Sequence, residues 1–167
     1  MGKSIFQKYA ARQVRKNQNK QRTKRFVNLK EAKSVHVLMA ANALTPIETE
    51  QFYKQVYAVA DLFQGMSCTW NITVCVRKMP VESKRFGVEV FDFKQVKCLS
   101  KKPKQPVVQT FTEKKVDVLI NLTPFVSYPI EHLAAISDAS LKVAIKLEDR
   151  PFAYDLQLQI DDIEQHA

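Results

Sequence analysis

The stretch from Val116 to Lys146 limits the possible folds of this chain more than any other. It reads VDVLINLTPFVSYPIEHLAAISDASLKVAIK: an apolar run, a turn, a helix-like segment and a second apolar run. A strand that is short and mostly apolar is typical of a parallel sheet covered on both faces. Pro129 suits the first helical turn, because it has no N–H to leave unbonded. The stretch therefore predicts one parallel strand–helix–strand crossover.

Further strands extend this crossover into a larger sheet. Apolar or alternating runs predict them at residues 34–40, 69–76 and 86–93, the last at a sheet edge. Residues 153–160 alternate in the same way, and their link to the preceding strand looks too short for a crossover. We therefore predict a three-layer, Rossmann-like α/β sandwich, with a mostly parallel sheet and an antiparallel C-terminal edge strand.

Local signals mark the helices and loops between these strands. Thr45 and Glu48 form a capping box around Pro46, which predicts the start of a long helix. Gly65 is expected to end that helix with a positive φ. Residues 95–106 contain two prolines and predict a surface loop, and residues 109–115 predict a short helix.

The positive charge of the chain is concentrated at its beginning. The 167 residues carry a net charge of +9 and suit one domain. Residues 1–25 hold nine Lys or Arg and no acid, so the remaining 17 basic and 17 acidic residues balance. We therefore divide the chain into a basic N-terminal helix or arm, residues 1–33, and a single α/β domain, residues 34–167.

The basic head allows several interpretations. Residues 4–16 predict an amphipathic helix, whose apolar face could simply dock on the body while its charges are solvated. The head could also contact nucleic acid or the ribosome, bind an anionic membrane surface, or act as a transit peptide. The candidate polyanion contacts are Lys8, Arg12, Arg15, Lys16, Lys20, Arg22, Lys24 and Arg25.

The cysteines and the hydropathy indicate a cytoplasmic protein. Cys68, Cys75 and Cys98 form no CxxC pair, and their number is odd, which favours reduced thiols in a cytosolic protein. The sequence has no apolar run long enough to cross a bilayer and no secretory signal.

The best candidate for a ligand pocket lies where two predicted parallel strands end. Ligands of open α/β sheets sit beyond the carboxyl ends of the strands, at a topological switch point. Asn42, Asn121 and Thr123 fall at such ends, and an asparagine side chain can both donate and accept hydrogen bonds. The alternative interpretation is that these side chains only satisfy loop backbone.

Common catalytic and cofactor signatures are missing from the sequence. It has only Gly2, Gly65 and Gly87, and no strand-to-helix turn carries the glycines that nicotinamide or ATP phosphates require. There is no GxSxG nucleophile motif, and the three histidines lie far apart. We therefore predict no catalytic residue, no cofactor and no metal site.

The segments DVLINL, AAISDASLKVAIK and YDLQLQI, together with the basic head, resemble a family of small hypothetical proteins from Bacteroidota. This resemblance implies an α/β fold in a bacterial cytosol and no assigned activity. A fainter likeness is to the first half of heptosyltransferase-type GT-B enzymes, although Lys-Val-Ala stands here where that pattern has a glycine. The likeness implies a glycosyltransferase-like half as an alternative.

These observations favour a non-enzymatic binding or adaptor domain, whose basic arm contacts an acidic partner: nucleic acid, the ribosome or an anionic membrane. The competing hypothesis is a small-molecule-binding or degenerate enzyme domain, with its site at the carboxyl ends of the parallel strands.

Overall fold

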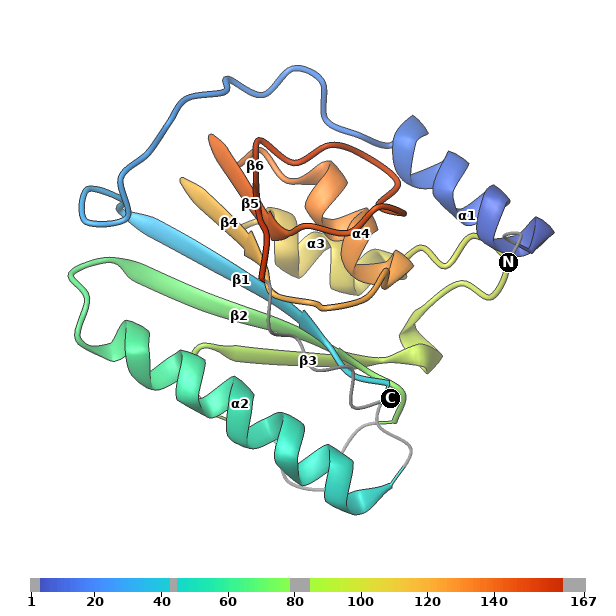
Figure 1. Ribbon diagram of the computed structural model, residues 1–167, viewed down its shortest axis with the longest axis horizontal. Coiled ribbons are helices and arrows are strands. Elements are labelled where there is room, and N and C mark those ends of the chain that lie inside the picture. The colour runs from blue at the N-terminus through green and yellow to red at the C-terminus, as the bar shows by residue number, and fades with distance from the viewer. Residues whose placement is uncertain (1–3, 43–44, 79–84, 161–167) are drawn as a thin grey trace.

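The computed structural model describes residues 4–42, 45–78 and 85–160, and it contains a single six-stranded sheet (Figure 1). The strands are β1 (Ser34–Ala40), β2 (Thr69–Val76), β3 (Val88–Asp92), β4 (Val118–Asn121), β5 (Leu141–Ile145) and β6 (Leu156–Leu158). Their order across the sheet is β3-β2-β1-β4-β5-β6, and every neighbouring pair is parallel.

Helices cover both faces of the sheet, which confirms the predicted three-layer α/β sandwich (Figure 1). The helical elements are α1 (Ile5–Lys16), α2 (Pro46–Gln64), the 3-10 turn η1 (Phe93–Gln95), α3 (Gln105–Thr112) and α4 (Tyr128–Ile136). Helix α2 packs on one face, and α1, α3 and α4 lie on the other.

The two faces alternate along each strand, as the period of a β-strand requires. Val35 and Val37 of β1 pack with Val56 and Ala60 of α2. Leu38, the next residue along β1, packs toward the α4 face instead. The β1 strand predicted from its apolar run is therefore buried on both sides, whereas the edge strand β6 is exposed.

Helix α4 is the centre of the second layer. Seven of its residues are buried, from Pro129 to Ala135, although two of them are Glu131 and His132. Helix α1 packs against α4 through Val14, even though the two helices are far apart in the chain. The head of the chain thus packs on the helical layer that covers this face of the sheet.

The prediction of an antiparallel C-terminal strand is wrong: β6 runs parallel to β5. The residues between these strands, 146–155, return across the α4 face without forming a helix, and they place Phe152 and Tyr154 in the core. An extended chain advances about 3.3 Å per residue, so this link is long enough to recross a five-residue strand. A parallel connection needs that reach, whether or not a helix supplies it.

Three local predictions have different outcomes. The capping box at Thr45 and Glu48 is confirmed, with both reciprocal hydrogen bonds present. Gly65 does follow α2, but the predicted positive φ is wrong, since its φ is −86°. Helix α3 begins at Gln105, earlier than predicted, because Pro106 fits a first helical turn.

Candidate functional site

A pocket of about 390 Å³ lies at the switch point of the sheet. The chain proceeds outward from β1 to β3 on one side and then continues from β4 to β6 on the other. The pocket is lined by Asn42, which follows β1, and by Phe125 to Pro129, which follow β4. It therefore occupies the position at which open α/β sheets usually bind ligands.

The walls of this switch-point pocket combine apolar and cationic side chains. They are formed by Asn42, Phe93, Val96, Lys97, Cys98, Lys101, Phe125, Val126, Ser127, Tyr128 and Pro129. Two phenylalanines and two valines supply flat and branched apolar surface. Lys97 and Lys101 contribute two positive charges, and no lining residue is acidic. Such a surface suits a ligand with an apolar body and a negative group.

The two lysines are held by a closed loop between η1 and α3. The amide N of Lys97 donates to the carbonyl of Lys102 at 2.8 Å, and the amide N of Lys101 donates to the carbonyl of Lys97 at 2.9 Å. Val96 and Pro103 form a bridge at the base of the loop. Lys101 has a φ of 53°, a left-handed conformation that is uncommon for residues other than glycine and concentrates at functional sites.

The first turn of α4 forms another wall of the pocket. Ser127 is the N-cap residue, but its side chain makes no capping hydrogen bond. The positive end of the helix dipole therefore lies at the pocket, where it favours an anion.

The three predicted pocket residues separate into two environments. Asn42 is exposed and lines the pocket. Asn121 and Thr123 are buried behind it, where Asn121 Oδ1 accepts a hydrogen bond from the Thr123 amide at 3.0 Å. Asn121 Nδ2 donates to Tyr154 Oη at 2.8 Å and to Glu131 Oε1 at 3.3 Å. Both side chains thus belong to a buried polar network.

An ion pair between Glu131 and Arg150 is the centre of this buried polar network. Arg150 also donates from Nε to the Ile145 carbonyl at 3.0 Å and from Nη2 to the Thr123 carbonyl at 3.1 Å. Tyr154 Oη donates to the second Glu131 oxygen at 3.1 Å. Arg150 therefore ties the β5–β6 link to the carboxyl ends of β4 and β5.

Burial raises the pKa of the Glu131 carboxyl, while the Arg150 charge and the donors from Tyr154 and Asn121 act against this shift. The hydroxyl of Thr123 is buried beside this pair without a hydrogen-bond partner in the described structure. The network is therefore strongly polar, and its carboxylate is already paired.

Sequence reasoning missed most of the pocket. Phe93, Val96 and Phe125 carry no polar signal, and their convergence depends on how the segment of residues 93–103 folds back. The available signal was positional: this lysine-rich segment directly follows the carboxyl end of β3.

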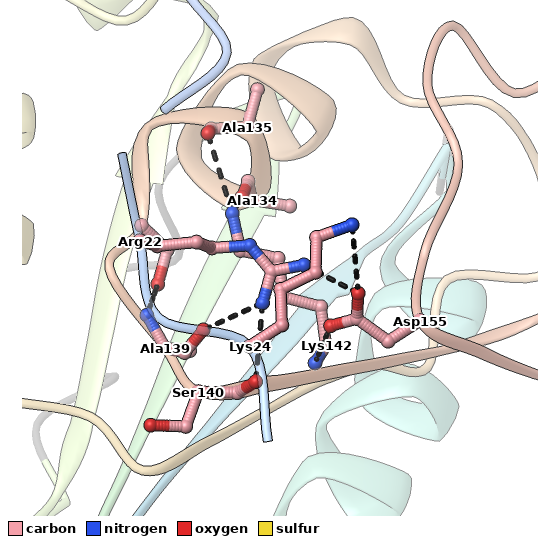
Figure 2. Close-up of polar contacts among 9 residues, drawn as sticks. Arg22, Lys24, Ala134, Ala135, Ala139, Ser140, Lys142 and Asp155 are labelled. Atoms are coloured by element: carbon pink, nitrogen blue, oxygen red, sulfur yellow. Dashed lines mark hydrogen bonds and ion pairs between the residues drawn. The ribbon is translucent and has the colours of Figure 1, made fainter. Parts of the chain in front are cut away.

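Part of the predicted polyanion-binding arm contacts the body (Figure 2). Arg22 has a side chain only 3% exposed, and its Nη1 donates to the carbonyls of Ala139 and Ser140 at 2.9 and 3.2 Å. Its Nη2 pairs with Asp155 at 2.5 Å, and Lys24 lies 3.5 Å from the same carboxylate.

Two further arm residues contact the body, although both are largely exposed. Arg15 Nε donates to the Pro151 carbonyl at 2.7 Å, and Arg25 lies 3.8 Å from Asp117. The exposed arm residues without such a contact among those described are Lys8, Arg12, Lys16 and Lys20. Half of the candidate cations thus serve internal contacts.

Lys142 is fully buried next to Arg22 (Figure 2). Its Nζ donates to the carbonyls of Ala134 and Ala135 at 2.6 and 3.3 Å, which satisfies carbonyls of the last turn of α4. Burial, reinforced by the Arg22 charge, lowers the pKa of Lys142 to about 7.

This pKa predicts that the protein becomes more stable as the pH rises from 7 to about 8.5, above which the Cys75 thiol, whose pKa burial raises to about 12, acts in the opposite direction. In that interval the unfolded chain keeps the Lys142 proton, with a pKa of about 10.4, and the folded chain releases it. The free energy of unfolding should therefore increase by up to about 1.4 kcal/mol per pH unit from this group. Urea titrations at several pH values should show a smaller slope for Lys142→Met and an unchanged slope for Lys115→Met. Equal slopes in all three proteins would contradict the assignment.

The described part of the chain holds no cluster of metal ligands, no membrane-spanning helix and no disulfide. No group of three or more His, Cys, Asp or Glu in this part of the chain could hold a metal ion. Among the described helices, none has the length and apolarity to cross a membrane. The cysteines are free thiols: Cys75 is buried, Cys68 is half-buried and Cys98 is exposed at the pocket.

Comparison with known proteins identifies a family. The model of a family described as "Family of unknown function (DUF6913)" matches residues 3–166. No curated protein and no solved structure gives a match. The family match spans both the basic head and the α/β body.

Proposed function

The chain belongs to the DUF6913 family of unknown function, and we propose that it binds a small organic anion with a flat apolar body at the switch-point pocket. The observation that carries this proposal is the composition of the pocket lining. At the carboxyl ends of β1 and β4, two phenylalanine side chains and two lysine side chains line the same cavity. The volume of about 390 Å³ is within the range of small-molecule pockets.

The electrostatics of the pocket support an anionic ligand. Lys97 and Lys101 are both exposed and carry no acidic neighbour in the lining, so a bound anion would meet uncompensated positive charge. The N-terminus of α4 adds a partial positive charge from the same side. Phe93 and Phe125 supply apolar area for the body of the ligand. Glycine-free walls are consistent with an organic anion rather than with a dinucleotide pyrophosphate.

A fluorescent aromatic sulfonate, anilinonaphthalene sulfonate, is a suitable probe because it combines both features. We expect saturable fluorescence enhancement with the wild-type protein and binding about tenfold or more weaker with Lys97→Gln/Lys101→Gln. A hydrogen bond to a charged group contributes roughly 1.5–3 kcal/mol, so the loss of two cations should be readily measured. Bound probe should also slow alkylation of Cys98, which lies in the pocket wall.

Two controls keep this test specific. Lys104→Gln/Lys115→Gln removes the same charge from exposed positions outside the lining and should bind the probe normally. Thermal unfolding of each variant should match the wild type, because the probe also binds partly unfolded proteins. The proposal would be refuted if the wild type and Lys97→Gln/Lys101→Gln bound the probe with equal affinity. It would also be refuted if bound probe left the alkylation rate of Cys98 unchanged.

The other expectations remain predictions. They are an origin in Bacteroidota, a cytoplasmic location, a division between a basic arm at 1–33 and a domain at 34–167, and contact of the arm with an acidic partner. The four arm cations without a contact to the body support the last of these, while the four that contact the body leave fewer charges free to bind such a partner.

A further inference from the structure

Helix α1 buries its small side chains and exposes its large ones. The buried residues are Ala10, Ala11 and Val14. In contrast, Ile5 is 83% exposed, Phe6 is 61% exposed and Tyr9 is 47% exposed. An amphipathic surface helix normally turns its largest apolar residues toward the core. The exposed apolar side chains of α1 therefore lack an explanation within the fold.

The exposed face of α1 has an order along the helix. Ile5, Tyr9, Arg12 and Lys16 follow one another at intervals of three or four residues, so they form a stripe on the side opposite the buried residues. The first half of this stripe is apolar and the second half is cationic. Lys8, also exposed, lies beside the stripe.

The chemistry of this stripe matches an anionic lipid surface. Residues 1–30 contain no acid, so nothing in this part of the sequence neutralises the cations of α1. Basic residues beside exposed aliphatic and aromatic side chains are the combination that holds an amphipathic helix in the headgroup region. A nucleic acid would use the cations but would gain little from an aliphatic side chain such as Ile5.

A second segment adds positive charge near the same layer. Residues 93–112 contain five lysines and no acid, and Leu99 among them is exposed. This segment contacts α4 where the Ser100 carbonyl lies 3.1 Å from Nε2 of His132, and α1 packs on the same helix. In Figure 1 this loop runs up toward the start of α1. Both segments would thus strengthen attraction to a negative surface.

We propose that α1 docks the protein on an anionic membrane surface, with Ile5, Phe6 and Tyr9 entering the headgroup region and Lys8, Arg12 and Lys16 facing lipid phosphates. This contact is peripheral, and its anchoring residues on α1 lie outside the switch-point pocket.

Vesicle co-sedimentation of the full chain tests the proposal. The wild type should bind vesicles of mixed phosphatidylcholine and phosphatidylglycerol and should bind pure phosphatidylcholine weakly. Lys8→Gln/Arg12→Gln should weaken binding to the mixed vesicles about thirtyfold, from roughly fivefold per basic residue near an anionic surface. Ile5→Gln/Phe6→Gln should weaken it about tenfold or more, because the apolar contact is lost while the charge is retained.

Matched variants outside α1 are the controls. Ile47→Gln/Leu62→Gln removes two exposed apolar residues of α2, and Lys54→Gln/Lys115→Gln removes two exposed charges. Both should bind the mixed vesicles as the wild type does, and all variants should retain the wild-type thermal unfolding midpoint. The proposal would be overturned if Ile5→Gln/Phe6→Gln bound the mixed vesicles as tightly as the wild type. It would also be overturned by tight binding to single-stranded RNA without binding to mixed vesicles.

Discussion

Replacing Glu131 by alanine is expected to lower the free energy of unfolding by about 3–5 kcal/mol, the usual cost of leaving one partner of a buried ion pair uncompensated. Both side chains of the Glu131–Arg150 pair are almost fully shielded from solvent. The variant would leave the Arg150 guanidinium and the Tyr154 hydroxyl without their carboxylate. Urea unfolding at neutral pH measures the loss.

The double variant Glu131→Leu/Arg150→Met distinguishes the contribution of the ion pair to stability from the contribution of side-chain packing. Because apolar residues can replace a buried pair with little loss, we expect its stability to lie between the wild type and the Glu131→Ala variant. It should not recover fully, since the carbonyls of Ile145 and Thr123 also lose the Arg150 donors. A double variant less stable than Glu131→Ala would contradict this account.

Acid is expected to unfold the protein through His36. This side chain is completely buried on β1, with Nε2 2.7 Å from Thr73 Oγ1 and its ring 4.8 Å from the Phe111 ring. Burial, with a contribution from the Lys114 charge, lowers the pKa of His36 to about 3. Its unfolded value is near 6.5, so between these values the unfolded state binds more protons, and stability falls as the pH falls. The loss from this residue reaches up to about 5 kcal/mol over the whole interval.

The variant His36→Leu tests this assignment. It should be less stable than the wild type at pH 7, because Thr73 loses its partner, but its stability should fall less steeply between pH 6.5 and 4. Burial also lowers the pKa of His132, to about 4, so some acid sensitivity should remain. Guanidinium titrations across this pH range give both slopes. An acid slope as steep in His36→Leu as in the wild type would remove His36 as a cause.

The fold was predictable where the information is local. The crossover predicted from Val116 to Lys146 is present as β4, α4 and β5. It could be predicted because the spacing of apolar residues within each short segment distinguishes a strand from a helix. The start of α2 at Thr45 follows from side chains that cap their own helix. The direction of β6 could not be predicted from local sequence. It depends on contacts of Arg150, Phe152 and Tyr154 that hold the helix-free β5–β6 link against the core.

For the candidate site, the sequence could predict the location but not the contacts of its residues. The rule for open sheets pointed to the carboxyl ends of β1 and β4, where Asn42 lines the candidate pocket. The rule could not tell that Asn121 faces Glu131 and Tyr154, because those partners arrive from α4 and from the chain after β5. Composition likewise identified the cations of the head, but not that Arg22 would be buried against Ala139.

The packing of α1 on α4 also has a consequence for the order of folding. Arg15 and the Pro151 carbonyl that it contacts are 136 positions apart in the chain. During synthesis α1 therefore emerges long before the segments it packs against. The side chains that α1 buries in the folded protein stay exposed until most of the chain has been made. Contacts of such long sequence separation slow folding, so the head should pack onto the body late although it is translated before the body.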